Sequence, residues 1–362
     1  MINVTSPYLP DIEKLYSYIQ SIYDSGYLTN NGPLVHRLEE RLKAYLGVKH
    51  VILTANGTMA LDIAYTALHL KGEVITTPFT FVATTNSLVH AGLKPIYADI
   101  DPETFNLDPA NIEPLITDRT TAIVPVHVFG NACDVESIET IAKKHNLKII
   151  YDAAHAFGVR YGENSILNFG DISILSFHAT KMFHTIEGGA IVTNDDTLAK
   201  EIRIIKNFGI DCPDTIKTVG INGKMNEFSA AMGLCVLDDI DIIIQRRKKI
   251  HDTYKQKLEG FVEFQSQNPK ATQNYSYFPI LLKNEREMFL VQKSLEEKGI
   301  ICRRYFHPSL DTIPYMDSAI EMNISRDIAK RILCLPIYPS LDLEDVERII
   351  ELTKKVLHAR ID

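Results

Sequence analysis

The chain has 362 residues, of which 45% are hydrophobic and 23% charged, and its 38 basic against 46 acidic residues give a net charge of −8. This composition excludes wholesale disorder, and the acidic balance argues against a non-specific nucleic-acid binder, which needs a basic face. The length predicts two domains, or one large α/β domain with an appendage.

Cysteine usage and the apolar segments bear on the compartment. The five cysteines are scattered and odd in number, without a CxxC pair, so they indicate neither a disulfide framework nor a zinc ribbon. Residues 1–7 have neither the basic region nor the apolar region of a secretory signal. No apolar stretch approaches the roughly 20 residues that span a bilayer. We therefore expect a soluble cytoplasmic protein.

Short β-rich runs alternate with helical patterns through the first two-thirds of the chain. The predicted strands are His50–Ala55, Glu73–Thr77, Lys94–Asp99, Thr121–His127, Leu147–Asp152, Asp171–Phe177 and Gly189–Thr193. The predicted helices are Thr58–Leu70, Phe81–Ala91, Val135–Asn146 and Thr197–Phe208. This alternation predicts a mainly parallel sheet that is covered by helices on both faces. Pro125, inside the fourth predicted strand, argues against a central position for that strand.

The last third has a different pattern. A long helical stretch, Met225–Leu258, has a break near Asp238-Asp239. After it we expect a strand at Tyr275–Leu282, a helix at Glu285–Lys298, a short strand at Ile301–Arg304, and helices at Ser325–Leu333 and Leu343–Leu357. The chain is therefore predicted to have a large α/β domain at residues 1–240 and a small α+β domain at residues 241–362.

Three segments carry residues suited to chemistry, and the first is Asn56-Gly57-Thr58, between a predicted strand and a predicted helix. The start of a helix presents unpaired backbone N–H groups and the positive end of the dipole, so it can hold a phosphate. Gly57 allows close approach of the backbone, and the Thr58 hydroxyl adds a donor. An ordinary helix cap is the alternative. GxGxxG and GxxxxGK[ST] motifs do not occur, so dinucleotide and P-loop sites lack their main support.

The second segment ends a predicted apolar strand at Asp152. Ligands of open α/β sheets bind beyond the carboxyl ends of strands, where a carboxylate can hold a protonated heterocycle nitrogen. A helix-capping role is the alternative for Asp152. His155, three residues on, either orients this carboxylate or lies in the core.

The third segment, Ser176–Ala190, contains Lys181 among apolar residues and ahead of a glycine pair. A lysine drawn into a partly dry site has a lowered pKa, which suits Schiff-base chemistry. A solvated loop lysine is the alternative. His178 and His184 lack a metal-ligand spacing, so no metal site is expected.

Together these segments resemble the pyridoxal 5′-phosphate (PLP)-dependent sugar-nucleotide aminotransferases of the DegT/StrS type. The resemblance covers nearly the whole chain, from Ser25–Pro33 to Leu333–Pro339, and includes Pro78–Thr84, Pro125–Asn131 and Gly223–Phe228. Many separate matches in the right order are more specific than any one of them. The resemblance implies the aspartate-aminotransferase (type I PLP) fold, with a large, mainly parallel sheet domain and a small C-terminal α+β domain.

The resemblance also implies roles for residues around the cofactor. Lys181 matches the catalytic lysine that bonds the cofactor and then moves a proton. Asp152 matches the partner of the pyridine nitrogen, which keeps that nitrogen protonated so that the ring can accept electrons. Phe81 matches the aromatic residue stacked on the ring, and His155 matches the residue near the O3′ oxygen.

Other residues match contacts to the cofactor phosphate. Gly57, Thr58 and Ser176 match contacts made within one subunit. Asn226 matches a residue that reaches the phosphate from the neighbouring subunit, which implies a homodimer with shared active sites. The alternative is that Asn226 caps its own helix.

The resemblance finally implies a reaction. Lys181 is present where the family's sugar 3-dehydrases carry His, so transamination is favoured over dehydration. The Ser176–Gly189 pattern resembles the branch that aminates C4 of 4-keto sugars, which implies a dTDP-linked 4-keto-6-deoxy sugar and glutamate as substrates, for an O-antigen or a glycoside. A C3 aminotransferase or one for UDP sugars is the alternative; a regulator that binds a sugar nucleotide without turnover is a more remote one. Arg303–His307 offers cations and rings for a nucleotide pyrophosphate, or is a solvated basic turn.

Overall fold

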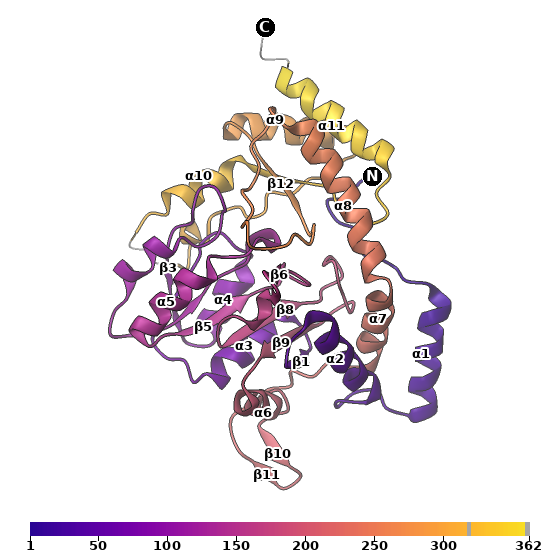
Figure 1. The fold of residues 1–362 in the computed structure, drawn as a ribbon, viewed down its shortest axis with the longest axis vertical. Coiled ribbons are helices and arrows are strands. Elements are labelled where there is room, and N and C mark those ends of the chain that lie inside the picture. Colours follow the sequence, from indigo (N-terminus) through magenta and orange to yellow (C-terminus); the bar gives the residue numbers. More distant parts are fainter. Residues whose placement is uncertain (317–319, 359–362) are drawn as a thin grey trace.

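The centre of the molecule is a seven-stranded sheet with strand order β1-β9-β8-β5-β4-β2-β3, seen in a computed structural model that describes residues 1–316 and 320–358 (Figure 1). The strands are β1 (His50–Thr54), β2 (Glu73–Thr76), β3 (Lys94–Tyr97), β4 (Thr120–Val124), β5 (Lys148–Asp152), β8 (Ile172–Ser176) and β9 (Gly189–Thr193). Strand β9 runs antiparallel to both of its neighbours, and the other adjacent strands are parallel. The mainly parallel sheet predicted from the sequence is confirmed.

Helices cover both faces of this sheet. On one face α3 (Gly57–Ala67), α4 (Val82–His90) and α6 (Asp196–Ile205) bury apolar side chains against the strands. On the other face lie α2 (Pro33–Leu46), α5 (Val135–His145) and α7 (Glu227–Asp238), and α1 (Ile12–Ser25) packs against α7 on the outside. The strands are apolar on both sides for this reason: in β1, Ile52 joins the first core, whereas Val51 and Leu53 join the second.

The expectation that Pro125 keeps its strand out of the sheet centre is wrong. Strand β4 lies between β2 and β5, and it ends at Val124, one residue before the proline. The N–H that proline lacks therefore falls beyond the regular ladder. The carbonyl of Pro125 still accepts a hydrogen bond from the N–H of Asp152 at 2.9 Å.

The C-terminal part begins with α7 and α8 (Ile240–Leu258), which break at Asp239 as predicted. Helix α8 continues from α7 toward α9 (Glu285–Glu296) and α11 (Leu343–His358) in Figure 1. Strands β12 (Phe278–Leu281) and β13 (Ile332–Leu335) pair antiparallel, and α10 (Asn323–Arg331) precedes β13. The predicted helix therefore runs two residues too far, because Ile332 and Leu333 belong to β13. The predicted strand at Ile301–Arg304 is reduced to a single bridge between Arg303 and Cys334.

A second apolar core fills this C-terminal part, between α8, α9, α11, β12 and β13. Ile2, at the start of the chain, joins it and bonds through its backbone to Gly299 and Ile301 at 2.8 and 2.7 Å. We keep residues 1–240 and 241–362 as the proposed domains, with this N-terminal segment added to the second core; residues 359–362 lie outside the described part.

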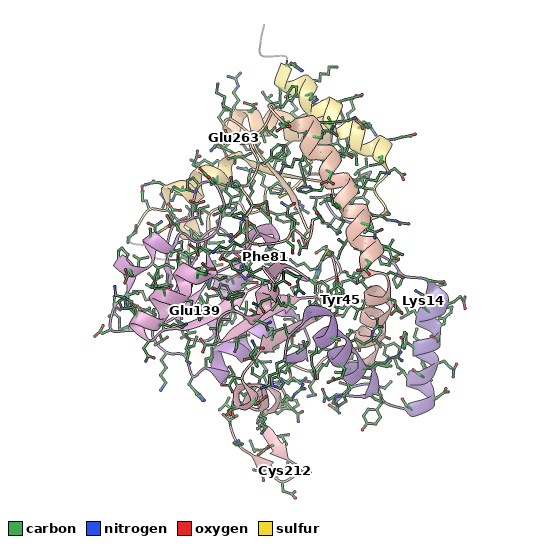
Figure 2. All side chains as sticks on the ribbon, in the orientation of Figure 1. Lys14, Tyr45, Phe81, Glu139, Cys212 and Glu263 are labelled. Carbon is green, nitrogen blue, oxygen red and sulfur yellow. The ribbon has the colours of Figure 1, made fainter. Side chains whose placement is uncertain are left out.

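Short elements complete the fold. The pairs β6 (Arg160–Tyr161) with β7 (Asn164–Ser165) and β10 (Ile210–Cys212) with β11 (Thr215–Ile216) form small antiparallel hairpins. The second hairpin projects beyond α6, and Figure 2 shows Cys212 at that end of the molecule. All five cysteines are free. Across residues 1–316 and 320–358, no helix is long and apolar enough to cross a membrane, and no group of three or more His, Cys, Asp or Glu residues could hold a metal ion.

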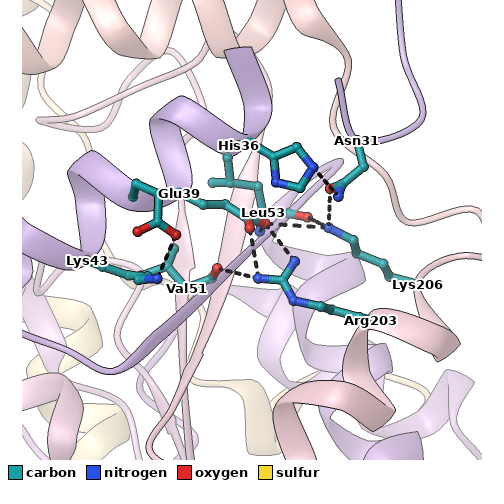
Figure 3. Close-up of polar contacts among 9 residues, drawn as sticks. Asn31, His36, Glu39, Lys43, Val51, Leu53, Arg203 and Lys206 are labelled. Carbon is teal, nitrogen blue, oxygen red and sulfur yellow. Dashed lines mark hydrogen bonds and ion pairs between the residues drawn. The ribbon is translucent and has the colours of Figure 1, made fainter. Parts of the chain in front are cut away.

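Strand β1 lies at the edge of the sheet, and a buried ionic cluster satisfies its outward backbone groups (Figure 3). The N–H of Leu53 donates to the Glu39 carboxylate at 3.0 Å, and the carbonyl of Leu53 accepts from Lys206 Nζ at 3.0 Å. Arg203 donates to the Val51 carbonyl at 3.4 Å and to Glu39 at 2.8 Å. The cluster thus seals an edge that would otherwise expose unpaired donors and acceptors.

Candidate active site

A cavity of about 610 Å³ collects most of the residues singled out in the sequence, and this volume is typical of small-ligand sites. It is lined, among others, by Gly57, Thr58, Phe81, Asp152, His155, Ser176 and Lys181. These residues come from the carboxyl ends of β5 and β8, the starts of α3 and α4, and the loop after β8. Because the carboxyl ends of parallel strands meet at one edge of the sheet, residues distant in sequence converge there.

Asp152 is the last residue of β5 and is buried against the cavity wall. Its carboxylate accepts hydrogen bonds from the Thr84 hydroxyl at 2.7 Å and from the Ala154 N–H at 3.1 Å. Burial raises the pKa of Asp152, while these two bonds and the charge of Lys181 lower it. A positive partner in the cavity would therefore favour the ionised carboxylate.

His155 is buried beside Asp152 and has a defined tautomer. Its Nδ1 accepts from the backbone N–H of Phe129 at 3.3 Å, so the neutral ring carries its proton on Nε2. Burial holds the pKa of His155 well below its usual value, and the charge of Lys181 acts in the same direction. The ring of Phe306 stacks parallel to that of His155 at 5.7 Å. His155 is thus a fixed neutral donor.

Lys181 follows β8 in a tight turn, in which its N–H donates to the His178 carbonyl at 2.8 Å. Its Nζ donates to the hydroxyl oxygen of Tyr277 at 3.3 Å. Burial lowers the pKa of Lys181 to about 8, against the opposing effect of the Asp152 carboxylate. A lysine with this pKa has a reactive neutral fraction near neutral pH, which a solvated loop lysine lacks.

The turn between β1 and α3 brings the start of a helix to the cavity, which Gly57 and Thr58 line. The Asn56 side chain caps Met59 N–H at 2.8 Å, whereas the N–H groups of Gly57 and Thr58 lie ahead of it in the first turn. A side chain at Gly57 would place its Cβ 3.0 Å from the Cβ of Ser176. A side chain at Gly189 would place its Cβ 2.6 Å from the Asn56 carbonyl. Glycines therefore allow the turn to lie directly against β8 and β9.

Phe81 precedes α4 and lies near the centre of the view in Figure 2. Phe81 lines the cavity and is 58% exposed. An exposed aromatic face at a cavity wall is suited to a planar ring stacked upon it.

Asn226 lies outside this cavity within its own chain. It is exposed, and its side-chain oxygen caps α7 by accepting from the Ser229 N–H at 2.9 Å. The capping role considered from the sequence is therefore present.

The residue set fits the PLP implied by the sequence. A phosphorylated pyridine aldehyde needs five kinds of group, and the cavity offers each of them. They are an amine of lowered pKa, a buried carboxylate, a neutral imidazole donor, a free aromatic face and a helix N-terminus. The close approach of Gly57 to Ser176 makes a cradle that any larger residue would fill.

Sequence reasoning missed other residues at this site. Thr84 orients Asp152, and Thr80 lies 3.0 Å from the Thr84 hydroxyl. Tyr277 and Tyr305 line the cavity from the C-terminal part of the chain. The two threonines belong to the segment Pro78–Thr84 that carries the resemblance, and Tyr305 belongs to the predicted cluster Arg303–His307. Signals for these residues therefore existed, whereas Tyr277 had none.

A second cavity of about 640 Å³ adjoins the first, and the two share the lining residues Thr80, Phe81, Tyr305 and Phe306. The basic cluster Arg303–His307 lines this second cavity, but its two arginines have different roles. Arg304 donates to Glu285 at 3.1 Å and to two backbone carbonyls near the end of α10, so it serves the fold. Arg303 is exposed and lines the cavity.

Comparison with known proteins agrees with this geometry. A model of the DegT/DnrJ/EryC1/StrS aminotransferase family matches residues 11–354. The dTDP-4-amino-4,6-dideoxy-D-glucose transaminase of Shigella dysenteriae is 44% identical over 365 residues, covering 98% of this chain and 99% of that protein. The crystal structure of DesI in the presence of its TDP-sugar product is similar at a TM-score of 0.94 and 35% identity, covering 99% of this chain and 94% of that one. NtdA from Bacillus subtilis, with bound cofactor PMP, has a TM-score of 0.89 at 29% identity, covering 98% and 86%.

Proposed function

Because the chain belongs to the DegT/DnrJ/EryC1/StrS aminotransferase family and is an aminotransferase, we propose that it transfers an amino group from glutamate to C4 of a nucleotide-linked 4-keto-6-deoxy sugar. The proposed acceptor is dTDP-4-keto-6-deoxyglucose and the product dTDP-4-amino-4,6-dideoxyglucose, for a surface polysaccharide such as an O-antigen or for a glycoside. The observation that carries the proposal is Lys181, a lysine of lowered pKa in a cavity shared with Asp152 and a helix N-terminus. The Shigella relative's name and the TDP-sugar product of DesI support the choice of sugar.

The proposed cofactor is PLP, which supplies an aldehyde and an electron-accepting ring for moving an amino group. The PMP of NtdA, the amino form of the same compound, supports this choice. Asp152 would hold the ring nitrogen and Phe81 would cover one face of the ring. His155 would donate from Nε2 to the ring hydroxyl.

The phosphate would lie at the start of α3, where Gly57 and Thr58 line the cavity and their N–H groups would serve as donors. The Ser176 hydroxyl, at the end of β8, adds a donor. A helix start carries about half a positive charge, which suits a phosphate dianion.

Lys181 would move the proton of the reaction. With a pKa of about 8, its amine is neutral in part of the molecules near neutral pH and can accept a proton, then return it. Asp152, held by Thr84 and Ala154, would carry a negative charge opposite a positive partner bound in the cavity. The chain therefore supplies both the base and the fixed counter-charge.

The second cavity supports a nucleotide-linked substrate, since it continues from the first across Phe81 and Tyr305. Arg303 offers a cation for a pyrophosphate there. The sugar would then lie toward Lys181 and the nucleotide toward Arg303.

A homodimer with shared sites is part of the proposal. Asn226 would reach the phosphate of the neighbouring subunit, and large apolar side chains near it are exposed: Leu28, Phe208, Val219, Ile221 and Phe228. Glu227, next to Asn226, ties these segments together because its N–H donates to the Leu28 carbonyl at 3.0 Å. We expect an interface well above the ~1,600 Å² of ordinary association.

A product assay tests the reaction. Purified protein, glutamate and a panel of 4-keto and 3-keto sugar nucleotides with dTDP, UDP and GDP are incubated, and the product is identified by NMR. The expected product carries its amine at C4 of the dTDP-linked sugar. An amine at C3, or turnover restricted to UDP sugars, would overturn the proposed substrate. A PLP absorbance band that fails to change with glutamate would overturn the reaction itself.

A mixing experiment tests the shared site. Lys181→Ala subunits are combined with Asn226→Asp subunits, whose carboxylate would repel the phosphate. If sites are shared, a mixed dimer has one site with both defects and one with neither, so activity should rise toward roughly a quarter of wild type. No recovery after verified subunit exchange would contradict the shared site, and so would a stable, active monomer.

A further inference from the structure

The amine of Lys181 contacts one phenol that the proposed reaction does not yet use. Nζ donates to the hydroxyl oxygen of Tyr277 at 3.3 Å and lies 5.8 Å from the centre of its ring. Tyr277 directly precedes β12, whereas Lys181 follows β8 of the main sheet. The contact therefore joins the cavity lysine to the C-terminal part of the chain, 96 residues away in sequence.

The ring of Tyr277 is held on several sides by other rings. His155 packs edge-on at 4.8 Å between ring centres, Phe129 lies at 5.4 Å and Tyr305 at 5.7 Å. Burial raises the pKa of the Tyr277 hydroxyl, so this group stays protonated across the working range of an enzyme. A neutral phenol can accept a hydrogen bond from an ammonium and donate one to a neutral amine. It can therefore bond Lys181 in both protonation states.

Side chains beside Tyr277 bond its segment to the cavity wall. The Asn274 amide donates to the carbonyls of His155 at 2.7 Å and Phe157 at 3.0 Å. The Ser276 hydroxyl donates to the same His155 carbonyl at 3.2 Å. The position of the phenol is thus set relative to the strand end that carries Asp152.

A fully buried arginine fixes the same segment from behind. Arg247, on α8, is 2% exposed, and its Nη1 donates to the carbonyls of Ser276 at 3.2 Å, Tyr275 at 3.5 Å and Ile337 at 3.1 Å. Burial lowers its pKa to about 10, which leaves the guanidinium charged at neutral pH. Nε of Arg247 is buried without a hydrogen-bond partner, so the three bonds from Nη1 carry the contact. They hold the backbone just before Tyr277 against Ile337.

We propose that Tyr277 is a positioning residue for Lys181, whose hydroxyl holds the lysine amine toward the cavity whenever that amine is not covalently engaged. The effect on catalysis rests on the proposed function, whereas the contact between Tyr277 and Lys181 is independent of it. A flexible four-carbon side chain that is free in a cavity samples many rotamers, and a proton acceptor displaced by about 1 Å loses much of its rate. One fixed hydrogen bond removes that freedom.

The test compares Tyr277→Phe with Tyr305→Phe, which removes a neighbouring phenol from the same cavity. In the full chain freed of cofactor, acetic anhydride acylates the neutral form of Lys181, and peptide mass spectrometry gives the rate against pH. Tyr277→Phe removes the partner of both forms of the amine. Because the hydrogen bond from the ammonium is the stronger of the two, the loss should lower the pKa of Lys181 by about one pH unit. In the holoenzyme the same variant should lower kcat about tenfold with little change in KM. Tyr305→Phe should leave the pKa of Lys181 at its wild-type value.

The outcomes separate this proposal from the proposed function. An unchanged pKa of Lys181 in Tyr277→Phe would overturn the positioning role of Tyr277 even if kcat fell, because loss of packing alone would then explain the lower kcat. Equal shifts in both variants would overturn it as well, since they would reflect a general change of the cavity. The labelling uses neither cofactor nor sugar, so a failed sugar assay would refute the proposed function and leave the labelling result intact.

Discussion

Two lysines, the partly buried Lys181 and the buried Lys206, have the same lowered pKa in opposite surroundings. Burial lowers the pKa of each to about 8. Lys206 is 4% exposed and lies in the closed cluster of Figure 3, with the Leu53 carbonyl at 3.0 Å and the Glu39 carboxylate at 3.6 Å. Lys181 lies on a cavity of about 610 Å³, and its amine donates to a neutral phenol.

The difference shows that a lowered pKa reports burial and does not by itself identify a catalytic lysine. Lys206 donates to the backbone of the edge strand β1 and pairs with Glu39, so its amine is not available to a ligand. Lys181 has space in front of it and a carboxylate, Asp152, that acts on it through charge alone. The four predictions below test this assignment of one lysine to chemistry and the other to structure.

Lys181→Ala should have the largest effect, a loss of transamination by at least about ten-thousandfold, because both the covalent attachment and the proton transfer require the amine. The far-UV circular dichroism spectrum should not change. Lys206→Met, measured alongside, should lose far less turnover per folded molecule. Retention of more than a few per cent of wild-type activity in Lys181→Ala would contradict the assignment.

Asp152→Asn should lower kcat by about a thousandfold, because a neutral amide cannot keep the cofactor nitrogen protonated. It should also move the pKa of Lys181 below about 8, since the Asp152 charge raises that pKa. Steady-state kinetics and amine labelling measure the two effects. An unprotonated ring nitrogen in the wild-type holoenzyme, seen by ¹⁵N NMR, would exclude the role of Asp152.

Lys206→Met should lower the free energy of unfolding by about 3 kcal/mol, because it breaks a buried ionic cluster and leaves the Leu53 carbonyl without its donor. Urea unfolding followed by circular dichroism measures the change. Lys49→Met is the matched control: Lys49 pairs with Asp196 at 2.8 Å on the surface, where such pairs contribute little. Equal losses in the two variants would show that burial of the cluster is unimportant.

The sequence could predict site residues that lie where a strand ends or a helix begins. Asp152, Ser176 and Gly57 all occupy such junctions, and the apolar pattern locates the junctions to within a residue or two. Tyr277 and Arg247 could not be predicted, because their roles depend on the packing of the C-terminal part against the sheet. An aromatic residue before a strand, or a basic residue in a helix, has no local pattern that marks it.

The differences between the predicted and the observed elements have two origins, tertiary pairing and local signals. Ile332 and Leu333 continue an apolar helical pattern, and only pairing with β12 turns them into a strand. The apolar run continues past Pro125 and predicts a longer strand, whereas the ladder ends at Val124. Helices α1 and α2 are not among the predicted elements, although a glycine follows each of them, Gly26 and Gly47, which is a local sign of a helix end.

The smallest expected effect concerns stability and has opposite signs for the two lysines. In the cofactor-free chain, Lys181→Met should raise the free energy of unfolding at pH 7 by about 2 kcal/mol, a value discounted for the partial exposure of Lys181. The folded chain releases the Lys181 proton near pH 8, whereas the unfolded chain keeps it to about pH 10.5. Between these values the unfolded state binds more protons, so the wild type gains stability as pH rises. The advantage of Lys181→Met should therefore be complete below pH 8 and vanish by about pH 10.5.

Lys206→Met also removes a lysine that titrates between these pH values. It should nevertheless remain less stable than the wild type throughout, because the hydrogen bonds and ion pair that it loses outweigh the relieved cost of burying a charge. Urea unfolding at five values between pH 7 and pH 11 measures both curves. A destabilised Lys181→Met at pH 7 would mean that this lysine, like Lys206, supports the fold, and the distinction between the two would fail.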